Sequence, residues 1–429
     1  MAVNRVRWFG RVSGRVRWVV PAGMLVTACS FPTSQDVCPD PAWSAHPDTI
    51  QAGGMTFFHL LAGAGRVVAI GVTQPAWGPV DPASRRPWVY ALRGSPIPAF
   101  PPLPGRHDVK GVFDRQGRLH VLWAAAATEE ITPSGSPQIV FHSVFDGKAW
   151  SGPGVVLDAG PGRLRPWSAS TPRPPFTDSA GVIHLFLPVT REGWAKIVHA
   201  SLDPRHGTWI TRELPGAAVP VYVDGDAINR SVIGVAYVAP DRDSPEPFDR
   251  NSVFFIALDE SLSLSADPLL VNRSGTFDAY DPRIVAQGSV LHLLWRKSLT
   301  SGMTLWATRS LDEGRTWSVP AQLDEPGNLR SNIEVVAGPE GKVHAFYART
   351  DGEVRRLMHT TLSDGTWSRP RPFLEPHLQR GQTWFDIVLD AAGNFHIAVL
   401  PAFEISGFQA LKMLYWTVPW QCLGADTTS

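Results

Sequence analysis

The chain of 429 residues consists largely of short apolar runs bounded by Gly, Asp or Pro. Residues 303–309 show the pattern clearly, because Met303, Leu305 and Ala307 take every second position there. A period of two residues, closed by turn-forming residues, is typical of β-strands. No long stretch has the period of an amphipathic helix, so the pattern predicts an all-β protein.

A Gly-bounded strand with a central histidine recurs along the chain. The last two intervals between these histidines are 52 residues each. Residues 232–237 hold a weaker copy without the histidine. A period of roughly 40–50 residues with one such strand per repeat is typical of a β-propeller. The repeated histidines are His120, His184, His292, His344 and His396.

Counting the repeats gives seven units, which favours a seven-bladed propeller, with six blades as the alternative. The last unit shows only three strands, and the segment before Gly53 is expected to supply the fourth and close the ring. The expected units are 55–103, 108–160, 166–216, 218–273, 278–325, 330–376 and 381–421.

The five repeated histidines resemble a metal-binding set at first sight. They occupy the same position in successive blades, however, so the ring keeps them apart. Each is expected to pack on a blade face and to bond a neighbouring loop. The chain has no His-Glu-x-x-His motif and no close Cys pair that would indicate zinc. We therefore expect the histidines to be structural, with no metal and no cofactor.

Residues 1–28 have the features of a targeting segment. Five arginines accompany an apolar stretch from Trp18 to Ala28, which is too short to span a bilayer as a helix. Residues Leu25–Cys29 resemble the bacterial lipobox, which implies lipidation of Cys29 and anchoring through several acyl chains. The alternative is an ordinary secretory signal with an incidental Cys. A lipoprotein would be exported and held at a Gram-negative outer membrane or on the outer face of a Gram-positive plasma membrane.

The two other cysteines, Cys38 and Cys422, stand near opposite ends of the mature chain. A propeller brings its ends together, and an extracytoplasmic compartment permits a disulfide. We predict a Cys38–Cys422 bridge, stabilising by ~4–5 kcal/mol on an entropic model, rather than two unpaired thiols. The expected organisation is a lipidated tether over 29–50, a propeller over 51–423 and a tail over 424–429.

Residues 310–317 read Ser-Leu-Asp-Glu-Gly-Arg-Thr-Trp, and looser copies occur at 145–150, 201–209 and 363–367. The octet resembles the Asp box, the bacterial neuraminidase repeat (BNR) of the sialidase superfamily of propellers. The resemblance implies a sialidase-like fold in which these boxes are structural. The Asp would cap backbone donors of the turn, and the Trp would pack between strands. The defined positions are Ser310, Asp312, Gly314, Thr316 and Trp317.

Sialidase activity requires more than the fold. The resemblance implies three arginines on the substrate carboxylate, a Tyr nucleophile activated by a Glu, and an Asp acid/base. In that family the first Arg stands in an Arg-Ile-Pro motif, which this chain lacks. Residues 282–285 match this motif only imperfectly and lie late in the chain. This departure counts against sialidase activity.

Several residues in or before the first strands of the units could face the central pocket. Glu325 and Glu375 are each followed by an Arg five residues later. The set would form an anionic-ligand site walled by Trp, which suits a sugar. The alternative is a series of blade-to-blade salt bridges inherited through duplication, while Asp224 and Asp226 are expected in a plain turn. The candidate ligand or catalytic residues are Arg165, Arg330, Arg380, Tyr280, Asp281, Glu334, Trp384 and Asp386.

The sequence favours an exported, membrane-anchored lipoprotein whose propeller binds or scaffolds a glycan or protein ligand at the cell envelope. An exo-sialidase-type glycoside hydrolase is the alternative, and a purely structural envelope module is a third hypothesis. Lys and Arg together number 39, as do Asp and Glu, and they form no basic stripe. Nucleic acid is therefore not expected as a partner.

Overall fold

The structure is a computed structural model. Cys29, Cys38, Arg165 and Arg380 lie outside its described residues, and of Arg330 only the backbone is described. The described residues are 48–51, 55–73, 86–100, 109–125, 139–160, 163–164, 174–191, 194–214, 222–229, 232–241, 251–259, 267–273, 275, 277–325, 327–351, 354–374, 384–400 and 412–423.

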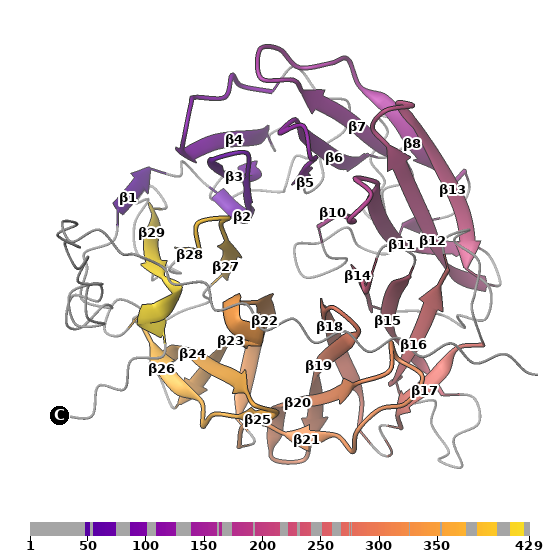
Figure 1. Cartoon of the computed structure of the whole chain (residues 1–429), viewed down its shortest axis with the longest axis vertical. Coiled ribbons are helices and arrows are strands. Elements are labelled where there is room, and N and C mark those ends of the chain that lie inside the picture. Colours follow the sequence, from indigo (N-terminus) through magenta and orange to yellow (C-terminus); the bar gives the residue numbers. More distant parts are fainter. Residues whose placement is uncertain are drawn as a thin grey trace, which may run out of the picture.

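Seven antiparallel sheets form a closed ring, which confirms the prediction of seven blades rather than six (Figure 1). The first three blades, numbered I to III, contain 12 strands in chain order. In blade III, both β9 and β10 pair with β11. Blade I is β2 (Met55–Gly63), β3 (Arg66–Thr73) and β4 (Arg86–Arg93). Blade II is β5 (Val109–Phe113), β6 (Leu119–Ala125), β7 (Ile139–Phe145) and β8 (Gly154–Asp158). Blade III is β9 (Arg163–Leu164), β10 (Phe176–Thr177), β11 (Ile183–Arg191), β12 (Trp194–Asp203) and β13 (Thr208–Leu214).

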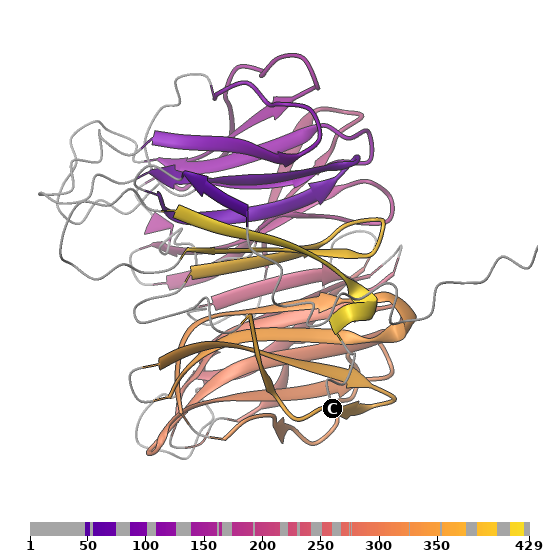
Figure 2. The same cartoon turned by 90° about the vertical axis from the view of Figure 1, so that its left-hand side faces the viewer.

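Blades IV to VII complete the ring, and most strands run along the axis down which Figure 1 is viewed (Figure 2). Blade IV is β14 (Tyr222–Ala227), β15 (Ile233–Pro240), β16 (Asn251–Leu258) and β17 (Leu269–Asn272). Blade V is β18 (Ala279–Gln287), β19 (Val290–Leu299), β20 (Gly302–Ser310) and β21 (Ala321–Gln322). Blade VI is β22 (Asn328–Ala337), β23 (Val343–Asp351), β24 (Val354–Ser363), β25 (Thr366–Trp367) and β26 (Arg371–Phe373), with the 3-10 turn η2 (Pro339–Gly341) between β22 and β23. Blade VII is β27 (Trp384–Leu389), β28 (Asn394–Leu400), β29 (Lys412–Pro419) and β1 (Asp48–Gln51), followed by the 3-10 turn η3 (Trp420–Leu423).

The ring is closed by strands from the two ends of the chain. Strand β1 is the outer strand of blade VII and pairs antiparallel with β29, Asp48 facing Tyr415 and Gln51 facing Lys412. The N-terminal segment thus supplies the strand that the last unit lacks, as predicted. Because β1 begins at Asp48, the propeller starts slightly before the expected boundary at residue 51. Among the described residues, no helix is long and apolar enough to cross a membrane.

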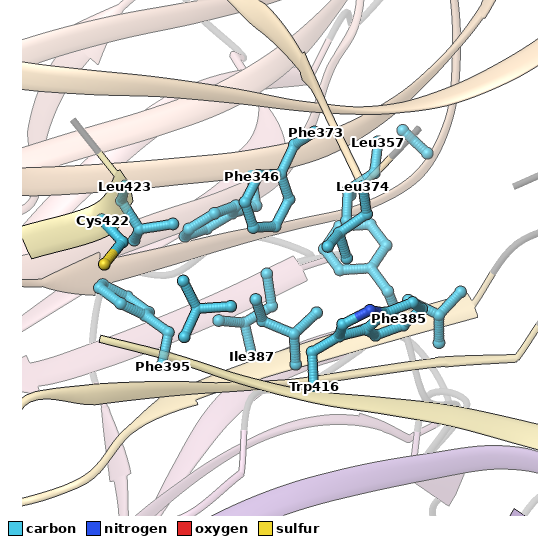
Figure 3. Packing of buried hydrophobic residues seen from close by; sticks show 14 residues of the cluster. Phe346, Leu357, Phe373, Leu374, Phe385, Ile387, Phe395, Trp416, Cys422 and Leu423 are labelled. Atoms are coloured by element: carbon cyan, nitrogen blue, oxygen red, sulfur yellow. The ribbon is translucent and has the colours of Figure 1, made fainter. Parts of the chain in front are cut away.

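The core is divided into seven apolar clusters, one at each interface between adjacent blades. At the VI–VII interface, Phe346 and Phe373 pack against Phe385, Phe395 and Trp416 (Figure 3). Every blade therefore buries both faces, which explains why strands such as β19 have nearly continuous apolar runs rather than strict alternation.

Four of the five repeated histidines bond within their own blades. His120 Nδ1 lies 2.9 Å from His142 Nε2 on the next strand, and His120 Nε2 lies 3.0 Å from Asp114 in the β5–β6 turn. Blade III repeats the pattern with His184, His199 and Asp178. In blade VI, His344 bonds His359, and in blade VII His396 bonds Tyr415 and Asp390. In blades II, III and VII these side chains tie the turn between the first two strands to the third strand, whereas in blade VI the bond joins only the second and third strands.

The octet at 310–317 forms a turn that is held by hydrogen bonds from its own side chains. Thr316 donates from its backbone N–H and its hydroxyl to Asp312, at 2.9 and 2.7 Å. Gly314 N–H donates to Ser310 Oγ at 2.8 Å, and Trp317 Nε1 donates to the Gly314 carbonyl. Gly314 has a φ of 91° and lies against the Phe255 ring, so a larger residue has no room there.

Burial keeps many histidines neutral, because it disfavours the charged imidazolium. The pKa falls to about 3 or about 4 in five of them. Burial is the largest cause for each, and a nearby positive charge or second histidine adds to it. These are His142, His199 and His359, at about 3, and His292 and His344, at about 4.

The free energy of unfolding should therefore fall as the pH drops from about 6.5 towards 4. In this window the unfolded chain binds protons at histidines that the folded protein keeps neutral, so protonation favours the unfolded state. Each such histidine contributes up to about 1.4 kcal/mol per pH unit. Denaturant unfolding at a series of pH values measures the slope. His199→Gln should make it shallower, while His206→Gln at an exposed position should not. A free energy that stays constant between pH 7 and pH 5 would contradict this account.

Candidate functional site

The inner edges of the first strands face the ring axis, where no further strand pairs with them (Figure 1). Unpaired backbone groups in such a place need other partners. Between blades IV and V, Asp224 Oδ2 accepts the Ile284 N–H at 2.9 Å, and Asp226 Oδ2 accepts the Ala286 N–H at 2.9 Å. The expectation of a plain turn at Asp224 and Asp226 is wrong, because both lie in β14 and bond the next blade.

Other blade pairs are joined in the same way. Asp386 Oδ2 of blade VII accepts the Leu60 N–H of blade I at 2.8 Å. Trp384 Nε1 donates to the Phe58 carbonyl at 3.1 Å. The candidates Trp384 and Asp386 thus hold blade VII against blade I.

One position of the first strands brings these side chains together. In each blade, one residue of the first strand pairs with the repeated histidine, or in blades I and IV with its equivalents Val68 and Gly234. The shared position lies two residues before that pairing residue. Its occupants are ionisable in six of seven blades, and we call them the inner ring. They are His59, Lys110, Pro174, Asp224, Arg283, Glu334 and Asp386.

The inner ring is largely buried. Lys110 is 0% exposed, and His59, Asp224, Arg283 and Asp386 are between 1% and 7% exposed. Arg283 Nε donates to the Ile333 carbonyl of blade VI at 2.8 Å. Of the sequence candidates, Glu334 and Asp386 belong to this ring. His59, Lys110 and Arg283 were missed, although counting back from the repeated histidine would have found the latter two.

His59 has the most unusual environment in the ring. Its Nδ1 lies 3.3 Å from Asp386 Oδ2. Burial lowers the pKa of His59 well below its usual value. The positive charges of Lys110 and Arg283 also lower it, against the opposing effect of Glu334. The imidazole is therefore neutral, with Nδ1 turned towards the carboxylate. Its buried Nε2 has no hydrogen-bond partner among the described residues.

Tyr280 and Asp281 lie where β18 departs from regular pairing. The register with β19 shifts between Tyr280 and Arg283, and Asp281 has a φ of 45°, which is rare for a residue with a side chain. Asp281 is 1% exposed. Its Oδ2 pairs with Arg296, while the buried Oδ1 has no hydrogen-bond partner in the described part of the chain. Tyr280 packs edge-on against Tyr222, with ring centroids 6.1 Å apart.

The expected cluster of three arginines falls largely outside the described residues. Arg165 and Arg380 lie there entirely, and the backbone of Arg330 belongs to β22 rather than to a preceding loop. Within the described ranges, no group of three or more His, Cys, Asp or Glu side chains could hold a metal ion.

Comparison with known proteins concerns the fold. No family model matches the sequence, and no curated protein gives a significant match. A polysaccharide lyase of family PL25, an ulvan lyase, aligns over 87% of this chain and 96% of its own, with 12% identity and a TM-score of 0.53. The NanB sialidase from Streptococcus pneumoniae aligns over 87% and 69%, with 12% identity and a TM-score of 0.46. At such identities the likeness is one of fold, a β-propeller.

Replacing Asp224 tests the blade-to-blade bonds. Asp224→Ala leaves the Ile284 N–H without its acceptor, and the free energy of unfolding should fall by about 1–3 kcal/mol. Asp224→Asn keeps one acceptor oxygen and should cost less. Denaturant unfolding measures both, with Asp267→Ala at an exposed position as the control. An Asp224→Ala protein as stable as the control would show that the bond does not stabilise the ring.

Proposed function

We propose that this protein is a membrane-anchored, extracytoplasmic propeller that binds an acidic glycan at the centre of its ring. The observation that carries the proposal is the His59–Asp386 pair, in which one buried imidazole nitrogen has no partner among the described residues. A buried polar atom without a partner is costly in a structure that binds nothing there. A sugar hydroxyl, which can both donate and accept, is a suitable partner for it.

The preference for an acidic glycan rests on the two cations of the inner ring, because two of its three carboxylates, Asp224 and Asp386, already accept backbone N–H groups. Arg283 and Lys110 are close enough to His59 to lower its pKa. In the sequence, Arg330 stands near the start of a first strand, and Arg165 and Arg380 stand before first strands. Guanidinium groups suit a carboxylate in shape and charge.

Export and anchoring are the second part of the proposal. They are supported by the basic leader, the apolar stretch and the lipobox-like sequence ending in Cys29. Cys422 is buried in the VI–VII cluster, close to the closure of the ring where the N-terminal segment joins blade VII. This placement suits a bridge from Cys38, whose own position lies outside the described residues.

Glycoside hydrolysis is the second candidate function, and Asp281 favours it. Backbone strain at a buried acid with one unpaired oxygen is typical of functional sites, and Tyr280 is its neighbour. The missing Arg-Ile-Pro motif counts against the sialidase type of this chemistry.

Binding to acidic sugars tests the proposed function. The full-length protein in detergent micelles should bind sialyllactose or hexagalacturonate in calorimetry. His59→Ala and an Arg330→Ala, Arg380→Ala double variant should each weaken binding about 10-fold or more, because each removes a hydrogen-bonding or charged partner. The exposed Arg315→Ala is the control. Failure of the folded protein to bind either sugar contradicts the proposal. Turnover of a fluorogenic sialoside that disappears in the double variant would establish the hydrolase instead.

Mass spectrometry of the protein isolated from its native membrane tests the anchor and the bridge. We expect an N-terminal, acylated Cys29, and no alkylatable thiol at Cys38 or Cys422 before reduction. A different, unmodified N-terminal residue would contradict the lipoprotein assignment. Two thiols that alkylate without reduction would contradict the disulfide.

A further inference from the structure

A polar groove lies between blades V and VI, away from the inner ring positions. Its volume is about 460 Å³, within the range of small-molecule sites. The segment that links β21 to β22 forms one wall. Arg349 of β23, Met358 of β24 and Arg369, just before β26, contribute the other. We call this site the V–VI groove.

The floor of the V–VI groove is fixed by Asp324. Its Oδ2 accepts the Tyr347 hydroxyl at 2.8 Å, and its Oδ1 accepts Arg349 Nη1 at 2.8 Å. Its backbone carbonyl accepts Thr304 Oγ1 at 2.7 Å and Gln322 Nε2 at 2.7 Å. Side chains of blade VI thus hold the Asp324 carboxylate, and Thr304 of blade V holds its backbone carbonyl, before any ligand arrives. This reduces the cost of ordering on binding.

Two further charged side chains of the groove are available to a ligand. Glu325 and Arg369 are exposed, and within the described part of the chain no hydrogen bond or ion pair engages either side chain. The Glu325 backbone is nonetheless fixed, because its N–H donates to Asp324 Oδ1 at 2.8 Å. One side chain offers acceptors only and the other donors only.

The lining suits a neutral, hydroxyl-rich ligand. Two carboxylates, Asp324 and Glu325, balance two guanidinium groups, Arg349 and Arg369, so neither an anion nor a cation is favoured by net charge. Apolar side chains, including Met358, lie beside these charges. A hexose ring combines an apolar C–H face with hydroxyls that both donate and accept.

We propose that the V–VI groove binds a neutral hexose unit of an oligosaccharide, independently of the ring centre. Sugar hydroxyls donate to Glu325 and accept from Arg369, while the C–H face lies on the apolar part of the lining. The groove would give the protein a second glycan contact, of different charge preference from the first.

Calorimetry on the full-length protein in detergent micelles tests this site with three probes: maltohexaose, cellohexaose and mannohexaose. At least one should bind. A Glu325→Ala, Arg369→Ala double variant should weaken that binding about 10-fold or more. Arg315→Ala, at an exposed arginine elsewhere in blade V, should leave it unchanged.

The same titrations on His59→Ala separate this site from the ring centre. Binding of the neutral hexaose should survive that substitution, whatever becomes of the acidic sugars. The proposal is overturned if none of the three hexaoses binds, if the groove double variant binds as well as the wild type, or if His59→Ala abolishes binding.

Discussion

The inner edge of each first strand is the constraint on which the rest of this structure depends. A propeller turns these edges towards its axis, where no strand remains to pair with their backbone groups. Side chains of the adjacent blade do so instead. Asp224 accepts from Ile284, Asp386 accepts from Leu60, and Arg283 donates to Ile333. These bonds set the register between blades, while the apolar clusters at the seven interfaces supply the hydrophobic stabilisation.

Because the side chains that bond these edges are charged, charge gathers at the centre of the ring. Burying a charge there costs free energy unless it is paired. The inner ring therefore contains both signs, and the imidazole of His59 stays neutral beside Lys110 and Arg283. Pairing is complete for the Asp386 carboxylate, which contacts both the Leu60 N–H and His59 Nδ1 through one oxygen and the Ile387 N–H through the other. It is incomplete for His59 Nε2, and this difference singles out one atom of the ring as a binding partner for something else.

The fold could be predicted from the sequence because each blade is a local unit whose strand pattern repeats along the chain. The 52-residue spacing of His292, His344 and His396 and the count of repeats favoured seven blades over six, and the strand missing from the last unit predicted closure by the N-terminal segment. The site was predicted only in part, with Glu334 and Asp386 placed at the centre. Lys110 was not among the candidates, and Arg283 was noted only within an imperfect match to Arg-Ile-Pro, because strand pairing, not a motif, brings them to one level of the ring. Asp224 was mistaken for a turn residue because Asp and Gly are typical of turns, whereas here the Gly225 Cβ position is filled by the Phe186 ring of blade III.

Comparison among the blades separates structure from candidate function. At the repeated histidine position, five of seven blades carry the same residue, and those in blades II, III, VI and VII bond within their own sheet. A structural role shared by these blades is enough to explain why they carry the same residue. The inner ring position is equally fixed by strand register, yet it holds His, Lys, Pro, Asp, Arg, Glu and Asp in turn. Bonding to the backbone of the next blade explains the carboxylates of Asp224 and Asp386. That role does not require the neutral imidazole of His59 in blade I, which has one nitrogen without a partner among the described residues. The departure of His59 from what its neighbours do is therefore the strongest reason to look for a ligand at the centre of the ring.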